Sequence, residues 1–157
     1  PPGVRLDGGG LVKGLVADVL AETLGGHDAF AVDCAGDLRL GGTAGLIRRV
    51  EVESPFDGSV LHAFDLTAGG VATSGIGRRS WLDGRGRPAH HLLDPGSGRP
   101  AFTGVVQTTA LAPTALEAET RSKASLLSGS TGAAPWLPDG GVLVFDDGSH
   151  RVIPAIA

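Results

Sequence analysis

The chain has 157 residues, of which 41% are hydrophobic and 19% charged, values typical of a single globular domain with a core of its own. The formal net charge of −4 and the aromatic content of 4%, with no Tyr, argue against a protein that binds nucleic acid. The single cysteine, Cys34, excludes an internal disulfide, and no apolar run reaches the length of a membrane span.

The first predicted element is a helix over residues 11–24. Its large apolar residues recur at helical spacing, and two glycines follow as a stop signal. Gly8, Gly9 and Gly10 precede it directly, so the free amide groups of its first turn face a loop without side chains. Together with Lys13, this segment favours a seat for a pyrophosphate, although three glycines before a helix also occur as a plain tight connection.

Short apolar stretches separated by turn residues predict a series of strands after this helix. They cover residues 29–33, 37–40, 46–52, 60–66, 70–74, 90–94 and 105–111. A second helix follows Pro113 and ends near Gly129, residues 128–140 form a surface loop, and a hairpin over 142–153 closes the chain. Few strands alternate with helices, so this order favours an α+β arrangement over a doubly wound sheet.

Two histidines, His90 and His91, lie in the stretch predicted at 90–94, with His91 three residues before Asp94 and a Pro-Gly turn following. A histidine near a phosphate ligand can act as a general base when a carboxylate or a turn amide orients it. Alternatively, Asp94 only caps its own turn, with one histidine exposed by alternation and the other packed.

Two further segments offer polar groups that either line a ligand or form ordinary turns. Thr73 and Ser74 place two hydroxyls at the end of a predicted strand, and Asp33 and Asp37 flank a turn of small residues. Neither segment alone favours one interpretation over the other.

On the second predicted helix, a helical wheel places Glu119 and Lys123 on the inward side. A Glu and a Lys four residues apart are commonly a solvated surface pair. The wheel puts this pair on the other face, together with Leu116 and Leu127, whereas the residues expected to face outward are Arg121, Ser122, Ser125 and Ser128.

Five segments, in this order, resemble the motifs of the FAD:protein FMN transferases, the ApbE family. They are DGGGLVKGLVAD, DCAGDLRL, GVATSG, HHLLDPGSG and AETRSKA, at residues 7–18, 33–40, 70–75, 90–98 and 118–124. The resemblance implies an α+β, T-fold-related layered antiparallel sheet with two main helices. It also implies that residues 1–157 are the carboxyl-terminal part of a single domain, whose amino-terminal half is missing or lies on a partner chain.

The resemblance further implies a Mg-dependent reaction, in which a Thr or Ser of an acceptor flavoprotein attacks FAD, receives FMN and releases AMP. Its catalytic residues here are His91 and Lys13, and its metal ligands are the Gly10 carbonyl and Glu119, with Lys123 in place of the family's Thr. The residues that it assigns to FAD binding are Gly8, Gly9, Gly10, Lys13, Thr73, Ser74, His91 and Asp94.

The replacement of the family's Thr by Lys123 leaves two alternatives open. The chain is then either a homologue that holds FAD without transferring it or a pyrophosphatase that hydrolyses FAD to FMN and AMP, and flavin binding needs no divalent metal. The habit of the family suggests an extracytoplasmic or membrane-associated location, and the sequence leaves a cytoplasmic one open.

Overall fold

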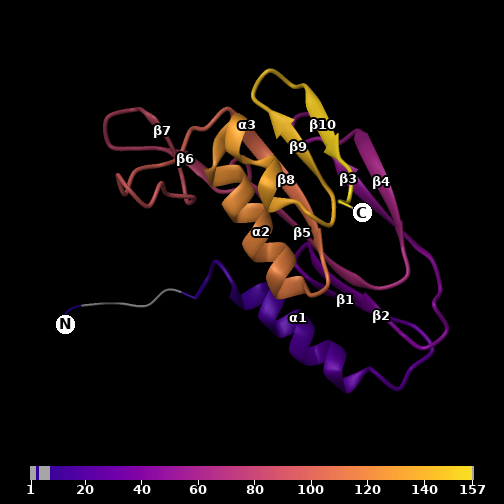
Figure 1. Cartoon of the computed structure of the whole chain (residues 1–157). Coiled ribbons are helices and arrows are strands. Elements are labelled where there is room, and N and C mark those ends of the chain that lie inside the picture. The colour runs from indigo at the N-terminus through magenta and orange to yellow at the C-terminus, as the bar shows by residue number, and fades with distance from the viewer. Residues whose placement is uncertain (1–2, 4–7, 157) are drawn as a thin grey trace.

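The computed structural model describes residue 3 and residues 8–156. Its centre is a six-stranded antiparallel sheet with the strand order β1-β2-β5-β8-β9-β10, and α1 and α2 lie on one face of it (Figure 1). The six strands are β1 (Phe30–Cys34), β2 (Asp37–Gly41), β5 (Gly69–Gly75), β8 (Val105–Ala112), β9 (Gly141–Phe145) and β10 (His150–Ile153). The α+β layered fold expected from the sequence is therefore confirmed.

Two hairpins lie outside this sheet. The first pairs β3 (Arg48–Glu53) with β4 (Val60–Leu66), and its Val52 packs against Val142 and Val144 of β9. The second pairs β6 (Ser80–Leu82) with β7 (Pro88–His90). The sequence predicted neither β6 nor this pairing, and residues 91–94 of the strand expected at 90–94 form only an isolated bridge between Leu93 and Pro100.

Helix α2 (Ala115–Leu127) packs on β5 and β8 through small side chains. Its amino terminus is capped by Thr114, whose hydroxyl accepts a hydrogen bond from the Glu117 amide. Ser122 and Ser125, which the helical wheel placed outward, are fully buried together with Ala115 and Ala118. That part of the wheel was wrong because small residues allow the helix to approach the sheet closely, while the inward position of Glu119 is confirmed.

Helix α1 (Val12–Thr23) is close to the predicted element but turns a different face inward. Its buried residues are Gly14, Ala17 and Ala21, and at Gly14 an added Cβ would lie 2.6 Å from the Ala115 carbonyl oxygen of α2. The large apolar side chains that defined the helical pattern are 42–53% exposed; they are Leu11, Val12, Leu15, Val16, Val19 and Leu20. A small-residue stripe, rather than the leucines and valines, therefore joins α1 to α2.

The predicted surface loop at 128–140 is instead partly helical and contributes to the core. It contains α3 (Gly129–Gly132) and a short 3₁₀ helix, η1 (Ala134–Trp136). Ala133 and Leu137 are fully buried and pack in one cluster with Leu126 and Leu143. Among the described residues, no helix is long and apolar enough to cross a membrane.

Candidate functional site

Helices α1 and α2 run side by side and supply a carboxylate to each other's amino terminus. The Glu119 Oε2 atom accepts a hydrogen bond of 2.8 Å from the Gly14 amide in the first turn of α1. In return, the Asp18 carboxylate accepts from the amides of Ala115 and Leu116 in the first turn of α2, both at 2.9 Å. Each carboxylate satisfies amides that have no partner within their own helix and lies at the positive end of that helix.

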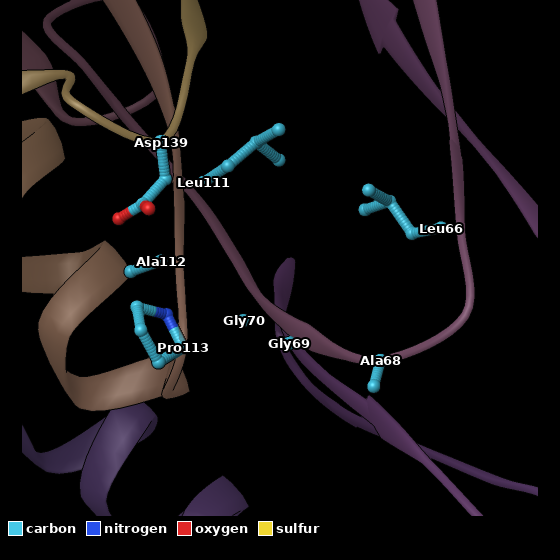
Figure 2. Close-up of a pocket in the computed structure, with 8 residues that line it drawn as sticks. All are labelled: Leu66, Ala68, Gly69, Gly70, Leu111, Ala112, Pro113 and Asp139. Carbon is cyan, nitrogen blue, oxygen red and sulfur yellow. The ribbon is translucent and has the colours of Figure 1, made fainter. Parts of the chain in front are cut away.

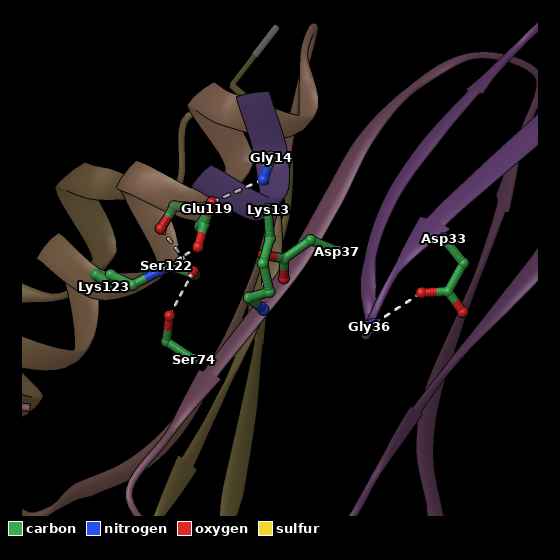
Figure 3. Close-up of polar contacts among 9 residues, drawn as sticks. All are labelled: Lys13, Gly14, Asp33, Gly36, Asp37, Ser74, Glu119, Ser122 and Lys123. Atoms are coloured by element: carbon green, nitrogen blue, oxygen red, sulfur yellow. Dashed lines mark hydrogen bonds and ion pairs between the residues drawn. The ribbon is translucent and has the colours of Figure 1, made fainter. Parts of the chain in front are cut away.

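Two ion pairs lie beside the start of α1. The Lys13 Nζ atom is 2.8 Å from Asp37 Oδ2, and the Lys123 Nζ atom is 2.8 Å from Glu119 Oε1. Figure 3 shows these four side chains next to one another, between the two helices and β2. Gly10 adjoins them, since a Cβ at Gly10 would lie 3.7 Å from the side chain of Lys123.

The two carboxylate side chains of this cluster are buried, and the two lysine side chains are partly exposed. The side chains of Asp37 and Glu119 are each 1% exposed, whereas those of Lys13 and Lys123 are 35% and 22% exposed. Burial raises the pKa of the Asp37 carboxyl above its ordinary value, the hydrogen bond from Lys13 opposes this rise, and the nearby charge of Glu119 adds to it. Two partly exposed lysine side chains therefore lie side by side, and a buried carboxylate holds the ammonium group of each.

His91 lies near this cluster and faces outward. Desolvation lowers the pKa of His91, a backbone hydrogen bond with Arg79 opposes this shift, and the positive charges of Arg79, Lys123 and Lys13 add to it. The lowered pKa favours the neutral form of His91, which is the form that a general base requires. Its neighbour His90 is 1% exposed and packs edge-on against Phe102, so the two histidines divide into one exposed and one packed.

Asp94, predicted as a partner of His91, forms its hydrogen bonds within its own turn. Its carboxylate accepts from the amides of Gly96 and Ser97 at 3.3 and 2.9 Å. These bonds lower its pKa, with the side-chain hydrogen bond from Ser97 contributing most. The group that holds His91 is instead the backbone of Arg79, which the sequence did not single out.

Thr73 and Ser74 point to opposite faces of β5, as neighbours in a strand do. The Ser74 hydroxyl lies under α2 at 2.8 Å from that of Ser122, on the side of the charged cluster. The Thr73 hydroxyl bonds instead to Thr109 of β8, also at 2.8 Å. Only Ser74 of the two therefore lies on the side that carries Lys13 and Lys123.

The two aspartates of DCAGDLRL also have different surroundings. Asp37 joins the charged cluster, whereas Asp33 accepts a hydrogen bond of 2.7 Å from the Gly36 amide in the β1–β2 turn. Ala35 and Gly36 both have positive φ, 55° and 90°, as the tight hairpin turn requires. Asp33 thus holds a turn, and Figure 3 shows it apart from the other charged groups.

The residues beside Gly10 do not fit a magnesium ion. Mg²⁺ favours six oxygen ligands in octahedral geometry. Both Glu119 oxygens are occupied, one by the Gly14 amide and the other by the Lys123 ammonium, which also places a positive charge where a cation would bind. Among residues 3 and 8–156, no group of three or more His, Cys, Asp or Glu side chains could hold a metal ion.

A separate cavity of about 250 Å³ opens between the end of β4, the start of β5 and the end of β8. Figure 2 shows its lining residues, which are Leu66, Ala68, Gly69, Gly70, Leu111, Ala112, Pro113 and Asp139. None of the predicted site residues belongs to it. Its one charged residue, Asp139, is already paired with Arg121.

Sequence patterns did not identify Asp18, Arg39 and Gly14, whose contacts join α1, α2 and β2 beside the site. Arg39 of β2 lies 3.2 Å from Asp18 Oδ1, which links the sheet to the helix pair. All three residues lie inside segments that carry the family resemblance, so the motifs contained the signal. Gly14 and Asp18 contact α2, about a hundred residues further along the chain, and Arg39 contacts Asp18; no local pattern reveals these contacts.

Comparison with known proteins agrees with this geometry. Residues 1–143 match the model of the ApbE family. The chain is 33% identical over 124 residues to a FAD:protein FMN transferase of Escherichia coli K12, covering 75% of this chain and 35% of the relative. It is 30% identical over 150 residues to that of Salmonella typhimurium, covering 92% and 43%.

Solved structures of ApbE proteins have the same fold as this chain. The ApbE protein of Thermotoga maritima superimposes with a TM-score of 0.80 at 28% identity, covering 96% of this chain and 52% of that one. The flavinyl transferase ApbE of Pseudomonas stutzeri superimposes with a TM-score of 0.75 at 24% identity, covering 94% and 49%. The chain spans about half the length of these structures and less than half of the curated relatives. It belongs to the ApbE family.

Proposed function

We propose that this chain forms the pyrophosphate side of a FAD:protein FMN transferase. It binds FAD, transfers FMN to a Thr or Ser of an acceptor flavoprotein, and releases AMP. The part of the family's length that this chain does not span completes the adenine side of the pocket. Two relatives named for this reaction are 33% and 30% identical to the chain over 124 and 150 residues, which supports the proposal.

One observation carries the proposal: Lys13 and Lys123 lie beside the amino terminus of α1 with partly exposed side chains, and a buried carboxylate holds each ammonium group. FAD differs from riboflavin by its pyrophosphate and adenosine, and the pyrophosphate carries the negative charge that such a seat recognises. Gly10 adjoins this position, since a Cβ there would lie 3.7 Å from the Lys123 side chain.

The chemistry needs a base and a stabilised leaving group. The acceptor hydroxyl oxygen attacks the phosphorus of the FMN moiety, its proton passes to the neutral His91 ring, and the bond to the AMP phosphate breaks. Lys13 and Lys123 stabilise the charge that develops on the phosphate oxygens as point charges. No step is assigned to a metal, because the residues present do not fit one.

A second candidate is a homologue that holds FAD without transferring it. The observation that favours it is the Lys123–Glu119 ion pair, which occupies the position where the family resemblance implies a metal. A lysine neutralises charge but cannot arrange several phosphate oxygens at once, as a metal ion does.

Incubation with FAD and an acceptor flavoprotein separates these functions. Transfer yields the acceptor with FMN attached and an equal amount of AMP, measured by intact mass and nucleotide chromatography. Intact bound FAD supports the second candidate, and free FMN with AMP in the absence of acceptor indicates a pyrophosphatase. If this chain alone binds no FAD, the same measurement with the amino-terminal half of a relative added tests whether that half is required.

A further inference from the structure

The β6–β7 hairpin carries an exposed apolar surface next to the candidate site. Trp81 and Leu82 are 53% and 68% exposed, although large apolar side chains in a hairpin usually pack against a core. Figure 1 shows the hairpin projecting away from the main sheet, beyond the end of α2 that adjoins α3. Exposed aromatic side chains on a projecting element are typical of surfaces that bind another protein.

The same hairpin is strongly basic, although the whole chain has a net charge of −4. Residues 76–90 contain four arginines and one acidic residue, Asp83. Asp83 is already bound by the Arg87 guanidinium and by the amides of Arg85 and Arg87, and the bond from Arg87 lowers its pKa to about 2. Within residues 8–156, the side chains of Arg78, Arg79 and Arg85 form no ion pair and remain available to a partner.

This basic surface is continuous with the proposed general base. Ser80 of β6 pairs with His90 of β7, and His91 follows directly. The backbone of Arg79 forms a hydrogen bond with His91, and its positive charge lowers the pKa of that histidine. A chain segment that places a hydroxyl at His91 therefore has Arg79 beside it and the rest of the β6–β7 hairpin, with Trp81, directly adjoining.

We propose that the β6–β7 hairpin is the docking surface for the acceptor protein and that it binds an acidic segment next to the modified hydroxyl. This proposal rests on the proposed transfer function and adds the chemistry of its protein substrate. Arg85 lies six residues before His91 in the hairpin, so an extended segment alongside, which advances about 3.3 Å per residue, would place its acidic residues about three to six positions from the acceptor Thr or Ser. Arg78 and Arg85 attract the acidic side chains, and Trp81 packs against an apolar neighbour.

Direct binding of model peptides tests this assignment. The probe is a fluorescently labelled peptide with a central Thr and Asp residues three to six positions on either side, and the comparator has Asn in place of each Asp. The test variant is Arg78→Glu with Arg85→Glu, and the matched control is Arg48→Glu with Arg151→Glu, which changes the same charge on strands β3 and β10. Trp81→Ala is the second variant, and circular dichroism checks that each protein is folded.

The proposal expects the unaltered protein to bind the acidic peptide about tenfold more tightly than the Asn peptide, with the difference shrinking at high salt. The test variant and Trp81→Ala lose this binding while the control pair and the affinity for FAD stay within about twofold. Equal binding of both peptides, or equal losses in the test and control variants, overturns the proposal. Binding only to vesicles of phosphatidylserine and phosphatidylcholine overturns it too, in favour of a membrane surface. Failure of the transfer function would appear separately, as neither FMN-modified acceptor nor AMP when the unaltered protein is incubated with FAD and an acceptor flavoprotein.

Discussion

Replacing Glu119 by Asp and Lys123 by Thr should create a magnesium site in a protein that, as it stands, is expected to bind no magnesium. The Lys123 ammonium lies 2.8 Å from Glu119 Oε1, beside Gly10, and occupies the carboxylate that a metal would need. Removing the ammonium frees that oxygen, and the Thr hydroxyl adds a neutral oxygen ligand. These are the two residue types that the family resemblance implies at the two positions.

The structure sets the magnitude of the first step. The Lys123→Thr change alone leaves the buried Glu119 carboxylate with only the Gly14 amide as partner. Removing one partner of a fully buried ion pair costs about 3–5 kcal/mol, and because Lys123 is 22% exposed we expect about 2 kcal/mol here. For a chain of this size, that loss lowers Tm by roughly 4–8 °C.

Thermal unfolding with and without magnesium is the assay. A magnesium concentration about 100 times the Kd stabilises a protein by about 2.7 kcal/mol, enough to offset the loss in the double variant. The matched control is Glu119→Asp with Lys123→Val, because Val has the shape of Thr without its hydroxyl. Magnesium should raise the Tm of the Thr variant, have less effect on the Val variant, and leave the unaltered protein unchanged.

One result would refute this reasoning. If the unaltered protein loses FAD binding or transfer on treatment with EDTA and regains it with magnesium, Lys123 is not a replacement for the metal. Glu119 would then be a ligand whose lysine partner turns toward the phosphates when the ion binds.

Further expectations concern the phosphate seat, the base and the helix pair. Lys13→Ala should weaken FAD more than riboflavin, since only FAD carries the charge that is neutralised; equal losses would contradict this. His91→Ala should lower the transfer rate about 100- to 10,000-fold and spare FAD affinity in a binding titration. Because desolvation and nearby cations lower the pKa of His91, transfer should fall with acidity only below pH 6.5, and Lys123→Gln should move this limb to higher pH. Gly14→Ala should lower the free energy of unfolding by about 1–3 kcal/mol, measured in urea, because its Cβ would meet the α2 backbone at 2.6 Å.

Much of the fold was predictable because its signals are local. The two main helices, most strands of the central sheet and the closing hairpin follow from apolar periodicity and turn residues. The division into one exposed and one packed histidine was predicted from strand alternation, although β7 ends at His90 and both Ala89 and His90 are buried. The β6–β7 hairpin was missed because its strands are three residues long and Trp81 and Leu82 are exposed, which leaves no alternating pattern to detect.

The orientation of the helices was not predictable from hydrophobicity. In α2, Ser122 lies against the sheet because its hydroxyl pairs with that of Ser74, so a polar residue is satisfied inside a close contact. In α1, the stripe of large apolar residues marks a face, but the pattern does not say what covers it. Gly14 and Ala17 make the contact with α2 instead, since the close approach of the helices excludes larger side chains.

The reciprocal bonds between the helices explain how Lys123 can stand at this position without disturbing the site. Glu119 binds the Gly14 amide through Oε2, at the positive end of α1, and this bond involves neither Lys123 nor a metal ion. Asp18 does the same for α2, so the two helices stay in register through their carboxylates. The cation beside Oε1 can therefore be replaced while Lys13, one residue before Gly14, keeps its ion pair with Asp37. A substitution at Lys123 should therefore change which cation pairs with Glu119 and leave the proposed position of the pyrophosphate unchanged.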